Sequence, residues 1–219
     1  MNKDYTHIIV ILDQSGSMES VREDTIGGFN QFIKDQQSKP GKATLTLVKF
    51  SHNYATEIDM QPIAGVKALT ANTYKPDGYT ALNDAVCKAI DCDGNKLSNM
   101  SEAERPGLVI CVILTDGEEN SSKEFTFNDV KDRVTQQTEK YNWQFIFIGA
   151  NIDAFAVGNQ FGITHGNTIQ YTANNIGTKK IYASMSANVA AYRSMSATGQ
   201  SLKDKDFFNN QDRDAQAKA

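Results

Sequence analysis

The chain has 219 residues, a formal net charge of −4 and a hydrophobic fraction of 40%. This length and composition are typical of one globular domain, or two at most, and they exclude a disordered or collagen-like chain. The mild negative charge, without any basic run, argues against nucleic-acid binding and against binding to an anionic membrane surface.

The cysteines and the apolar runs indicate the cellular compartment. No uncharged apolar stretch reaches the roughly 18 residues of a membrane-spanning helix. The first apolar run, residues 8–12, is too short for the hydrophobic region of a signal peptide. The three cysteines cannot all pair within one chain, and their spacing fits no zinc motif. We therefore expect a cytoplasmic protein in a reducing environment.

Strands and helices are expected to alternate along the chain. Near-continuous apolar runs at residues 7–12 and 108–114 predict strands buried on both faces, and each run is followed closely by an aspartate. The more alternating run at 54–63 predicts an antiparallel edge strand. Further strands are predicted at residues 43–50, 143–148 and 168–172.

Apolar stripes with helical spacing separate these strands. They predict helices around residues 26–33, 82–90, 127–141, 154–158 and 181–195. Gly199 is placed to end the last helix. Because strand–helix alternation requires crossover connections, the pattern predicts an α/β fold. We expect a Rossmann-like three-layer open sheet, mostly parallel with one antiparallel edge strand, and helices on both faces.

The end of the chain differs from the rest in composition. The main domain is predicted to span residues 1–198, and no linker divides it. From Gln200 onward the chain is polar and balanced in charge, and only Phe207 and Phe208 interrupt it. This composition predicts a flexible polar tail over residues 199–219, with a docking element as the alternative.

Oxygen-bearing side chains follow the predicted strands. In an open parallel sheet, ligands bind beyond the carboxyl ends of the strands. Asp13, Ser15 and Ser17 follow the first strand, Thr80 precedes the second helix, and Asp116 follows the long central strand. Such an all-oxygen set suits a hard cation, Mg²⁺ or Mn²⁺, and does not suit zinc or copper. Taken alone, each group is equally consistent with a turn residue or a helix N-cap.

The order and the strand contexts of these residues resemble the von Willebrand factor A domain and its metal-ion-dependent adhesion site. The resemblance rests on Asp13-x-Ser15-x-Ser17, Thr80 and Thr115-Asp116-Gly117. It covers roughly residues 5–197, and it implies the α/β fold described above. Residues 24–29 and 149–154 are similar to a prokaryotic and phage subgroup of these domains.

The resemblance also implies a role for each residue. Ser15 and Ser17 would coordinate the metal through their hydroxyls, and Thr80 would do so directly or through a water. Asp13 and Asp116 would act through water or would orient the serines. A carboxylate from a partner protein would fill the open coordination position. The expected metal is Mg²⁺, with Mn²⁺ or Ca²⁺ as alternatives.

The charges of the set favour an acidic partner. Two carboxylates offset a divalent cation, and neutral hydroxyls leave it Lewis acidic, so an Asp or Glu of the partner is attracted. We expect the rim that selects the partner to comprise Gln14, Met18, Tyr79, Glu118 and Glu119. The sequence therefore predicts a metal-dependent protein-binding module without catalysis.

Two other functions stay open. An assembly or structural protein with an unused metal site would make its contacts through residues 65–79 and through the tail after Gly199. A Mg²⁺-dependent phosphohydrolase would use Asp13 as its nucleophile, but that chemistry needs a second aspartate where this chain has Ser15. The chain has no glycine-rich nucleotide-binding loop, and no Ser-His-Asp order stands out.

Overall fold

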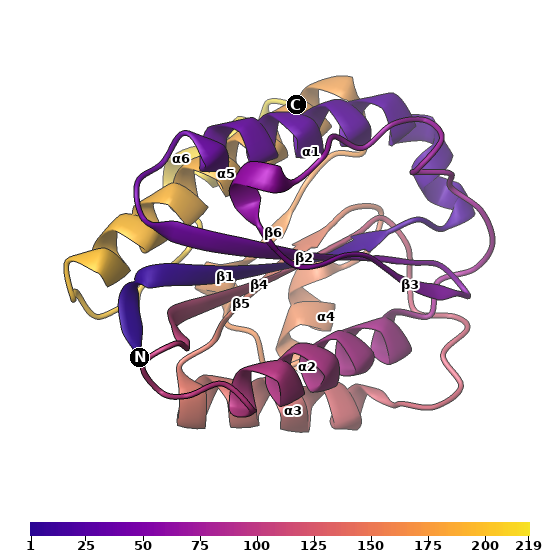
Figure 1. Cartoon of the computed structure of the whole chain (residues 1–219). Helices are drawn as coiled ribbons and strands as arrows, with labels where there is room; N and C mark the ends of the chain where they lie inside the picture. The colour runs from indigo at the N-terminus through magenta and orange to yellow at the C-terminus, as the bar shows by residue number, and fades with distance from the viewer.

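A computed structural model describes residues 1–219 and places six strands in one sheet between two helical layers (Figure 1). The strand order is β3-β2-β1-β4-β5-β6. All neighbouring strands are parallel except β3, which runs antiparallel to β2 at one edge. The strands are β1 (Asn2–Asp13), β2 (Lys42–Phe50), β3 (Tyr54–Pro62), β4 (Pro106–Thr115), β5 (Gln144–Gly149) and β6 (Thr168–Gln170). The predicted fold class is confirmed.

Helices cover both faces of the sheet. The principal helices are α1 (Arg22–Gln37), α2 (Leu82–Ser98), α3 (Phe127–Tyr141), α4 (Ala154–Gln160), α5 (Asn175–Ala197) and α6 (Asn210–Ala217). Figure 1 shows α1 and α5 on one face and α2, α3 and α4 on the other. None of the helices combines the length and the apolar character that crossing a lipid bilayer requires.

The central position of β1 in the sheet explains why its sequence is apolar without alternation. Successive side chains of a strand point to opposite faces of the sheet. Ile8 and Val10 therefore enter the core beneath α1 and α5, whereas Ile9 and Ile11 enter the core above α2 and α3. Parallel pairing of β1 with β4, which sets Leu12 opposite Leu114, brings the carboxyl ends of both strands to one edge.

Two consecutive glycines inside α1 differ in what surrounds them. A Cβ on Gly28 would lie 2.3 Å from the ring of Tyr182, so the absence of a side chain lets α1 approach α5. A Cβ on Gly27 would meet nothing within 4 Å.

We expect alanine substitutions at these two positions to change stability in opposite directions. Gly28→Ala should lower the free energy of unfolding by about 1–3 kcal/mol, because it overpacks the helix interface. Gly27→Ala should raise it by about 0.5–1 kcal/mol, because alanine favours helix more than glycine does. Urea denaturation measures both values, and a Gly28→Ala variant as stable as the wild type would contradict this packing.

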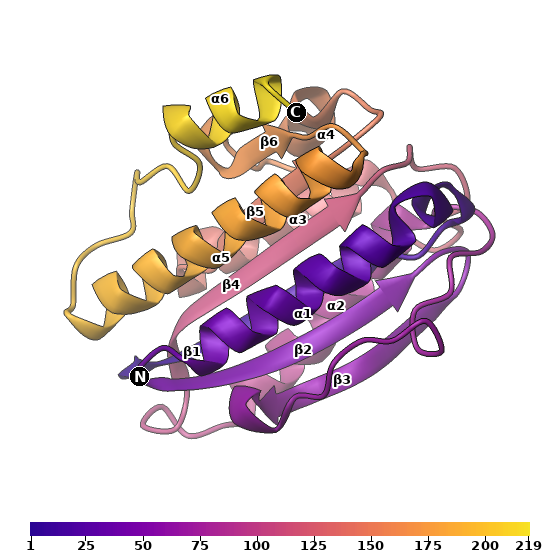
Figure 2. The same ribbon diagram turned by 90° about the horizontal axis from the view of Figure 1, so that it is seen from above.

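The C-terminal segment differs from the predicted flexible tail. Gly199 does end α5, with φ of +74°, but the chain then returns along the domain and forms α6 beside α5 (Figure 2). Phe207 and Phe208 are 2% and 1% exposed, and the Arg213 guanidinium donates hydrogen bonds to the carbonyls of Thr168 and His165. Two adjacent aromatic rings bury enough apolar surface to dock a segment that is otherwise polar.

Candidate metal centre

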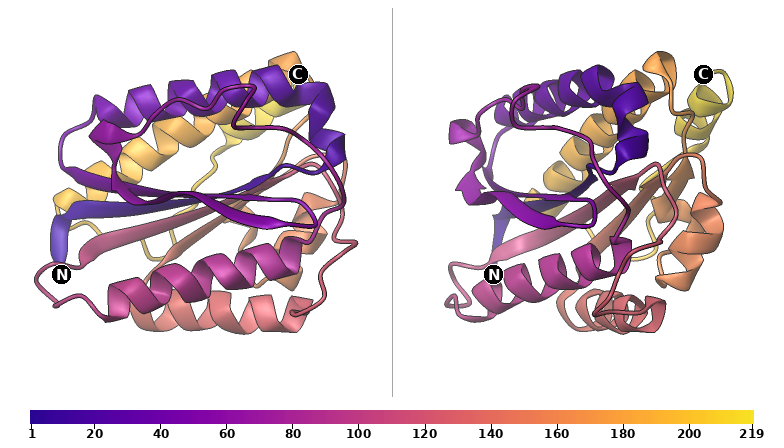
Figure 3. Two further views of the ribbon diagram at one scale, coloured as in Figure 1. Left: turned by 45° about the vertical axis from the view of Figure 1, so that its right-hand side comes forward. Right: turned by 90° about the vertical axis from the view of Figure 1, so that its right-hand side faces the viewer.

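Three loops meet at the carboxyl edge of the sheet, which faces the viewer in the right panel of Figure 3. One follows β1, one precedes α2, and one follows β4. The pairing of β1 with β4 places the first and third side by side. The second is held against the first, because the Gly16 amide donates to the Gly78 carbonyl at 3.0 Å and the Asp77 amide donates to the Gln14 carbonyl at 2.9 Å.

Three hydroxyl groups converge on one small space beside Gly117. The Oγ atoms of Ser15 and Ser17 lie 3.1 Å apart, and Ser17 Oγ donates to Asp116 Oδ1 at 2.5 Å. A Cβ on Gly117 would lie 3.0 Å from Thr80 Oγ1, 3.6 Å from Ser17 Oγ and 3.9 Å from Ser15 Oγ. Because residue 117 has no side chain, this space stays open. Ser17 is exposed, so the space is accessible from solvent.

Asp13 supports this arrangement from below. Its side chain is buried, with Oδ1 accepting the Ser15 amide at 2.7 Å and Oδ2 accepting the Thr115 hydroxyl at 2.5 Å. Both carboxylate oxygens therefore hold the loop in place. Burial raises the pKa of Asp13 to about 6, against the lowering effect of these hydrogen bonds.

Asp116 has one oxygen without a partner. Its Oδ1 accepts Ser17 Oγ, whereas its Oδ2 is buried and receives no hydrogen bond. Burial raises the pKa of Asp116 above its ordinary value. A buried carboxylate oxygen without a donor is unfavourable in a folded protein, and a cation relieves that cost by favouring the charged form. The residues present therefore fit a divalent cation.

Helix capping does not account for these hydroxyls. Ser15 precedes the 3₁₀ helix Gly16–Val21, but its side chain makes no capping hydrogen bond. The N-cap of α2 is Ala81, so the Thr80 hydroxyl has no capping role there either. The protein contains no cluster of three or more His, Cys, Asp or Glu side chains that could hold a metal. A cation bound here would draw most of its ligands from hydroxyls, as hard cations accept.

Comparison with known proteins identifies the family. The sequence model of the von Willebrand factor type A domain matches residues 7–203. The chain belongs to this family. No curated protein matches the sequence.

Solved structures share the fold of this von Willebrand factor type A domain at low identity. Proximal thread matrix protein 1 from the mussel byssus is 14% identical, with a TM-score of 0.56, over 85% of this chain and 46% of that chain. One structure of that mussel protein has zinc in its metal-ion-dependent adhesion site. The minor pilin PilB of Streptococcus sanguinis is 11% identical, with a TM-score of 0.58, over 90% of this chain and 64% of that chain. The chain thus spans less than two thirds of either protein.

BatB from Bacteroides thetaiotaomicron is similar over nearly its whole length. It is 12% identical, with a TM-score of 0.52, and the match covers 88% of this chain and 99% of that chain. These identities establish the shared fold of the von Willebrand factor type A domain and no more.

Three of the five predicted rim residues lie at the surface of the von Willebrand factor type A domain, and each is close in sequence to one of the proposed metal-site residues. Tyr79 is 69% exposed and directly precedes Thr80. Glu118 is exposed on the loop after β4, and Gln14 is half-buried between Asp13 and Ser15. All three side chains are therefore at least partly exposed.

The other two rim predictions need correction. Met18 is fully buried, because the 3₁₀ helix after β1 turns Met18 and Val21 into the core beneath α1. The carboxylate of Glu119 is taken up by hydrogen bonds from the Asn83, Ser121 and Ser122 amides at 2.7–2.9 Å and from the Ser122 hydroxyl at 2.7 Å. These hydrogen bonds make Glu119 a brace of its own loop.

Two residues that support the proposed metal centre could not be identified from the sequence of this von Willebrand factor type A domain. Tyr74 is fully buried under the centre, where its hydroxyl donates to the Asp13 carbonyl at 2.6 Å, and burial raises its pKa. Tyr74 falls within residues 65–79, the segment predicted to make the contacts of an assembly protein. Asn120 Oδ1 accepts the Thr80 amide at 2.9 Å. Both contacts join segments distant in sequence, and no local spacing predicts them.

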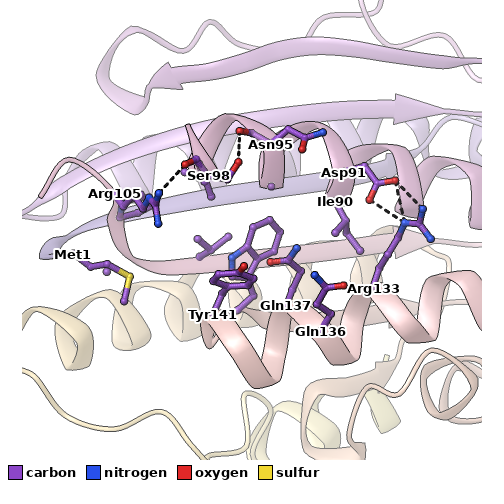
Figure 4. A pocket seen from close by; sticks show the side chains of 16 residues that line it. Met1, Ile90, Asp91, Asn95, Ser98, Arg105, Arg133, Gln136, Gln137 and Tyr141 are labelled. Atoms are coloured by element: carbon purple, nitrogen blue, oxygen red, sulfur yellow. Dashed lines mark hydrogen bonds and ion pairs between the residues drawn. The ribbon is translucent and has the colours of Figure 1, made fainter. Parts of the chain in front are cut away.

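A separate cavity of about 420 Å³ lies between α2 and α3 (Figure 4). The residues around it include Gln136, Gln137 and Tyr141, and the bidentate ion pair of Asp91 with Arg133 lies at its side. Pro106 and Gly107, at the start of β4, also line it, so it belongs to the amino edge of the sheet. It shares no residue with the hydroxyl cluster of the von Willebrand factor type A domain.

Proposed function

We propose that this protein binds a partner protein through a divalent cation, Mg²⁺ in the first instance, and performs no catalysis. The observation that carries the proposal is the convergence of the Ser15, Ser17 and Thr80 hydroxyls beside Gly117. In this proposal the three hydroxyls hold the cation, while Asp13 and Asp116 orient them. Membership of a family with metal-dependent protein-binding members supports it.

The chemistry of the site favours a carboxylate from the partner. The two aspartates offset the charge of one divalent cation, and the hydroxyls add no negative charge, so the cation still attracts an anion. Tyr79, the residue before Thr80, has an exposed ring, which offers a large contact surface of the kind that dominates many protein interfaces. We propose that the partner places an Asp or Glu on the cation and packs an apolar group against Tyr79.

The surroundings of Asp13 argue against a phosphohydrolase. A nucleophilic carboxylate needs an oxygen that the substrate can reach. Asp13 is fully buried, and both of its oxygens accept hydrogen bonds from the protein. A carboxylate in this position supports its neighbours and is badly placed to attack a phosphate ester.

Partner capture in Mg²⁺ and in EDTA tests the proposal. We expect the wild-type protein to capture a partner in Mg²⁺ and to release it in EDTA, and the double variant Ser15→Ala, Ser17→Ala to capture none. Ser20→Ala is the matched control, because Ser20 lies on the same 3₁₀ helix, is exposed and donates only to the Ser17 carbonyl. This control should capture the partner as the wild type does.

Two results would replace the proposal with another function. Capture that survives EDTA and the double substitution would favour an assembly protein with an unused metal site. Mg²⁺-dependent hydrolysis of a phosphate ester that Asp13→Asn abolishes would favour the phosphohydrolase.

A further inference from the structure

The loop after β4 and the start of α2 are joined by a dense set of hydrogen bonds, which we call the Asp84–Glu119 brace. Asp84, in the first turn of α2, is buried. Its carboxylate accepts three consecutive backbone amides of the loop, those of Lys123 at 3.0 Å, Glu124 at 3.0 Å and Phe125 at 2.9 Å. One side chain of α2 thereby orders the far end of the loop.

Glu119 acts in the reverse direction. Its Oε2 accepts the Asn83 amide of α2 at 2.8 Å, and its Oε1 accepts the Ser121 and Ser122 amides of its own loop at 2.9 and 2.7 Å. The Ser122 hydroxyl donates to Glu119 Oε2 at 2.7 Å and accepts the Asp84 amide at 3.0 Å. The loop thus caps α2, while α2 orders the loop.

Thr80 is held between the two parts of the brace. Its amide donates to Asn120 Oδ1 at 2.9 Å, and its carbonyl accepts the Asn120 and Ser121 amides at 3.0 and 3.2 Å. These bonds matter because no sheet pairing positions Thr80. The β1–β4 pairing aligns the serine loop with Asp116, but Thr80 lies near the end of the irregular stretch 66–81.

We propose that Asp84 and Glu119 are positioning residues of the metal centre, which hold Thr80 at a fixed distance from Asp116 and Gly117. The inference rests on the proposed function, since it concerns the same cation. Neither carboxylate is free to coordinate the cation itself, because backbone amides and a hydroxyl occupy its oxygens. Ordering the ligands before the cation arrives removes an entropic cost from binding.

Outer partners of metal ligands have measurable effects on affinity, typically about 10–100-fold. We therefore expect Asp84→Ala and Glu119→Ala each to raise the dissociation constant for Mn²⁺ by about 10–100-fold. Asp84→Asn and Glu119→Gln keep one acceptor oxygen and should raise it less. Electron paramagnetic resonance of free Mn²⁺ measures this dissociation constant. The measurement is made well below the melting temperature that each variant shows in EDTA, so that only folded protein is compared.

A second readout follows the geometry without any metal. In EDTA, hydrogen exchange at the Thr80 amide should be faster in the alanine variants than in the wild type. Glu124→Ala is the matched control. It also removes a carboxylate from this loop, but the Glu124 carboxylate pairs with Lys88 at the surface. This control should change neither the Mn²⁺ constant nor exchange at Thr80.

The outcomes separate this inference from the proposed function. If the alanine variants only lower unfolding stability and bind Mn²⁺ as tightly as the wild type, the brace is structural and the inference is overturned. If the wild type binds no Mn²⁺, the proposed metal centre fails and the inference fails with it. If the wild type binds Mn²⁺ and the brace variants bind it weakly, the inference stands, even where Mg²⁺-dependent partner capture is not found.

Discussion

Gly117→Ala is expected to weaken binding of Mg²⁺ or Mn²⁺ by about 100-fold or more, because the new methyl group occupies the space between the ligands. That methyl group would lie 3.0 Å from Thr80 Oγ1 and within 4 Å of both serine Oγ atoms. A cation must approach each of these oxygens to about 2.1 Å. The same methyl group should affect the metal-free protein little, because Gly117 has no left-handed φ and its nearest new contact is a side chain.

Isothermal titration with Mg²⁺ and urea denaturation in EDTA distinguish the two effects. We expect the unfolding free energy of metal-free Gly117→Ala to stay within about 1 kcal/mol of the wild type. Gly27→Ala is the matched glycine-to-alanine control, remote from the centre, and it should bind Mg²⁺ normally. Wild-type affinity in Gly117→Ala would show that the cation does not lie between these hydroxyls.

Asp93→Ala is expected to lower the free energy of unfolding by about 3–5 kcal/mol, because it breaks a buried polar network. Asp93 Oδ2 lies 3.0 Å from His7 Nε2, and its Oδ1 accepts Lys96 Nζ at 2.9 Å. His7 Nδ1 in turn lies 2.8 Å from Thr44 Oγ1. His7 and Asp93 are 0% and 1% exposed, so removal of the carboxylate leaves a buried ring nitrogen without its partner.

A surface ion pair made by another aspartate of α2 provides the comparison. Asp91 pairs with Arg133, but its side chain is 44% exposed, so Asp91→Ala should cost only about 0–1 kcal/mol. Urea denaturation of both variants at neutral pH measures the contrast. If both variants lost the same free energy of unfolding, burial of the Asp93 network would not be what makes it stabilising.

The same network predicts how stability depends on pH. Burial opposes ionisation of Asp93, but hydrogen bonds from His7 and Lys96 outweigh burial and lower its pKa below the ordinary 3.8. A lowered pKa in the folded protein means that ionised Asp93 stabilises the fold above pH 3.8, and that this contribution is lost as the pH falls further towards the folded pKa. The difference in unfolding free energy between wild type and Asp93→Asn should therefore shrink in acid. A constant difference down to pH 2 would contradict the pKa shift.

Much of the architecture follows from local sequence patterns. The runs at 7–12 and 108–114 predict β1 and β4 because a strand covered on both faces needs apolar side chains at every position. The shared location of Asp13, Ser15, Ser17 and Asp116 could also be predicted, because parallel strands end at one edge and carry the residues after them to that edge. Thr80 follows no parallel strand, so this rule does not place it.

The supports of the centre could not be predicted in this way. Asp84 and Asn120 bind backbone amides that lie 39 to 41 residues away in the chain, and the fold alone brings them together. Glu119 looked like a partner contact because an acidic residue beside a metal motif has the same sequence signature whether its carboxylate faces solvent or caps a helix.

Burial of single residues outside the main elements was likewise decided by packing. Met18 follows Ser17 in a polar stretch, yet the 3₁₀ turn directs it into the core. Phe207 and Phe208 dock the C-terminal segment although its average composition is polar.

The sequence by itself determined which oxygen-bearing residues follow which apolar strands of this protein. Because these strands are parallel, it also determined that the residues after them meet at one edge of the sheet. Only the tertiary structure decided which carboxylates stay available and which are consumed by backbone amides. The physical reason is that hydrophobic periodicity is a local property of the chain, whereas a hydrogen bond to a distant loop depends on where the whole fold places both partners.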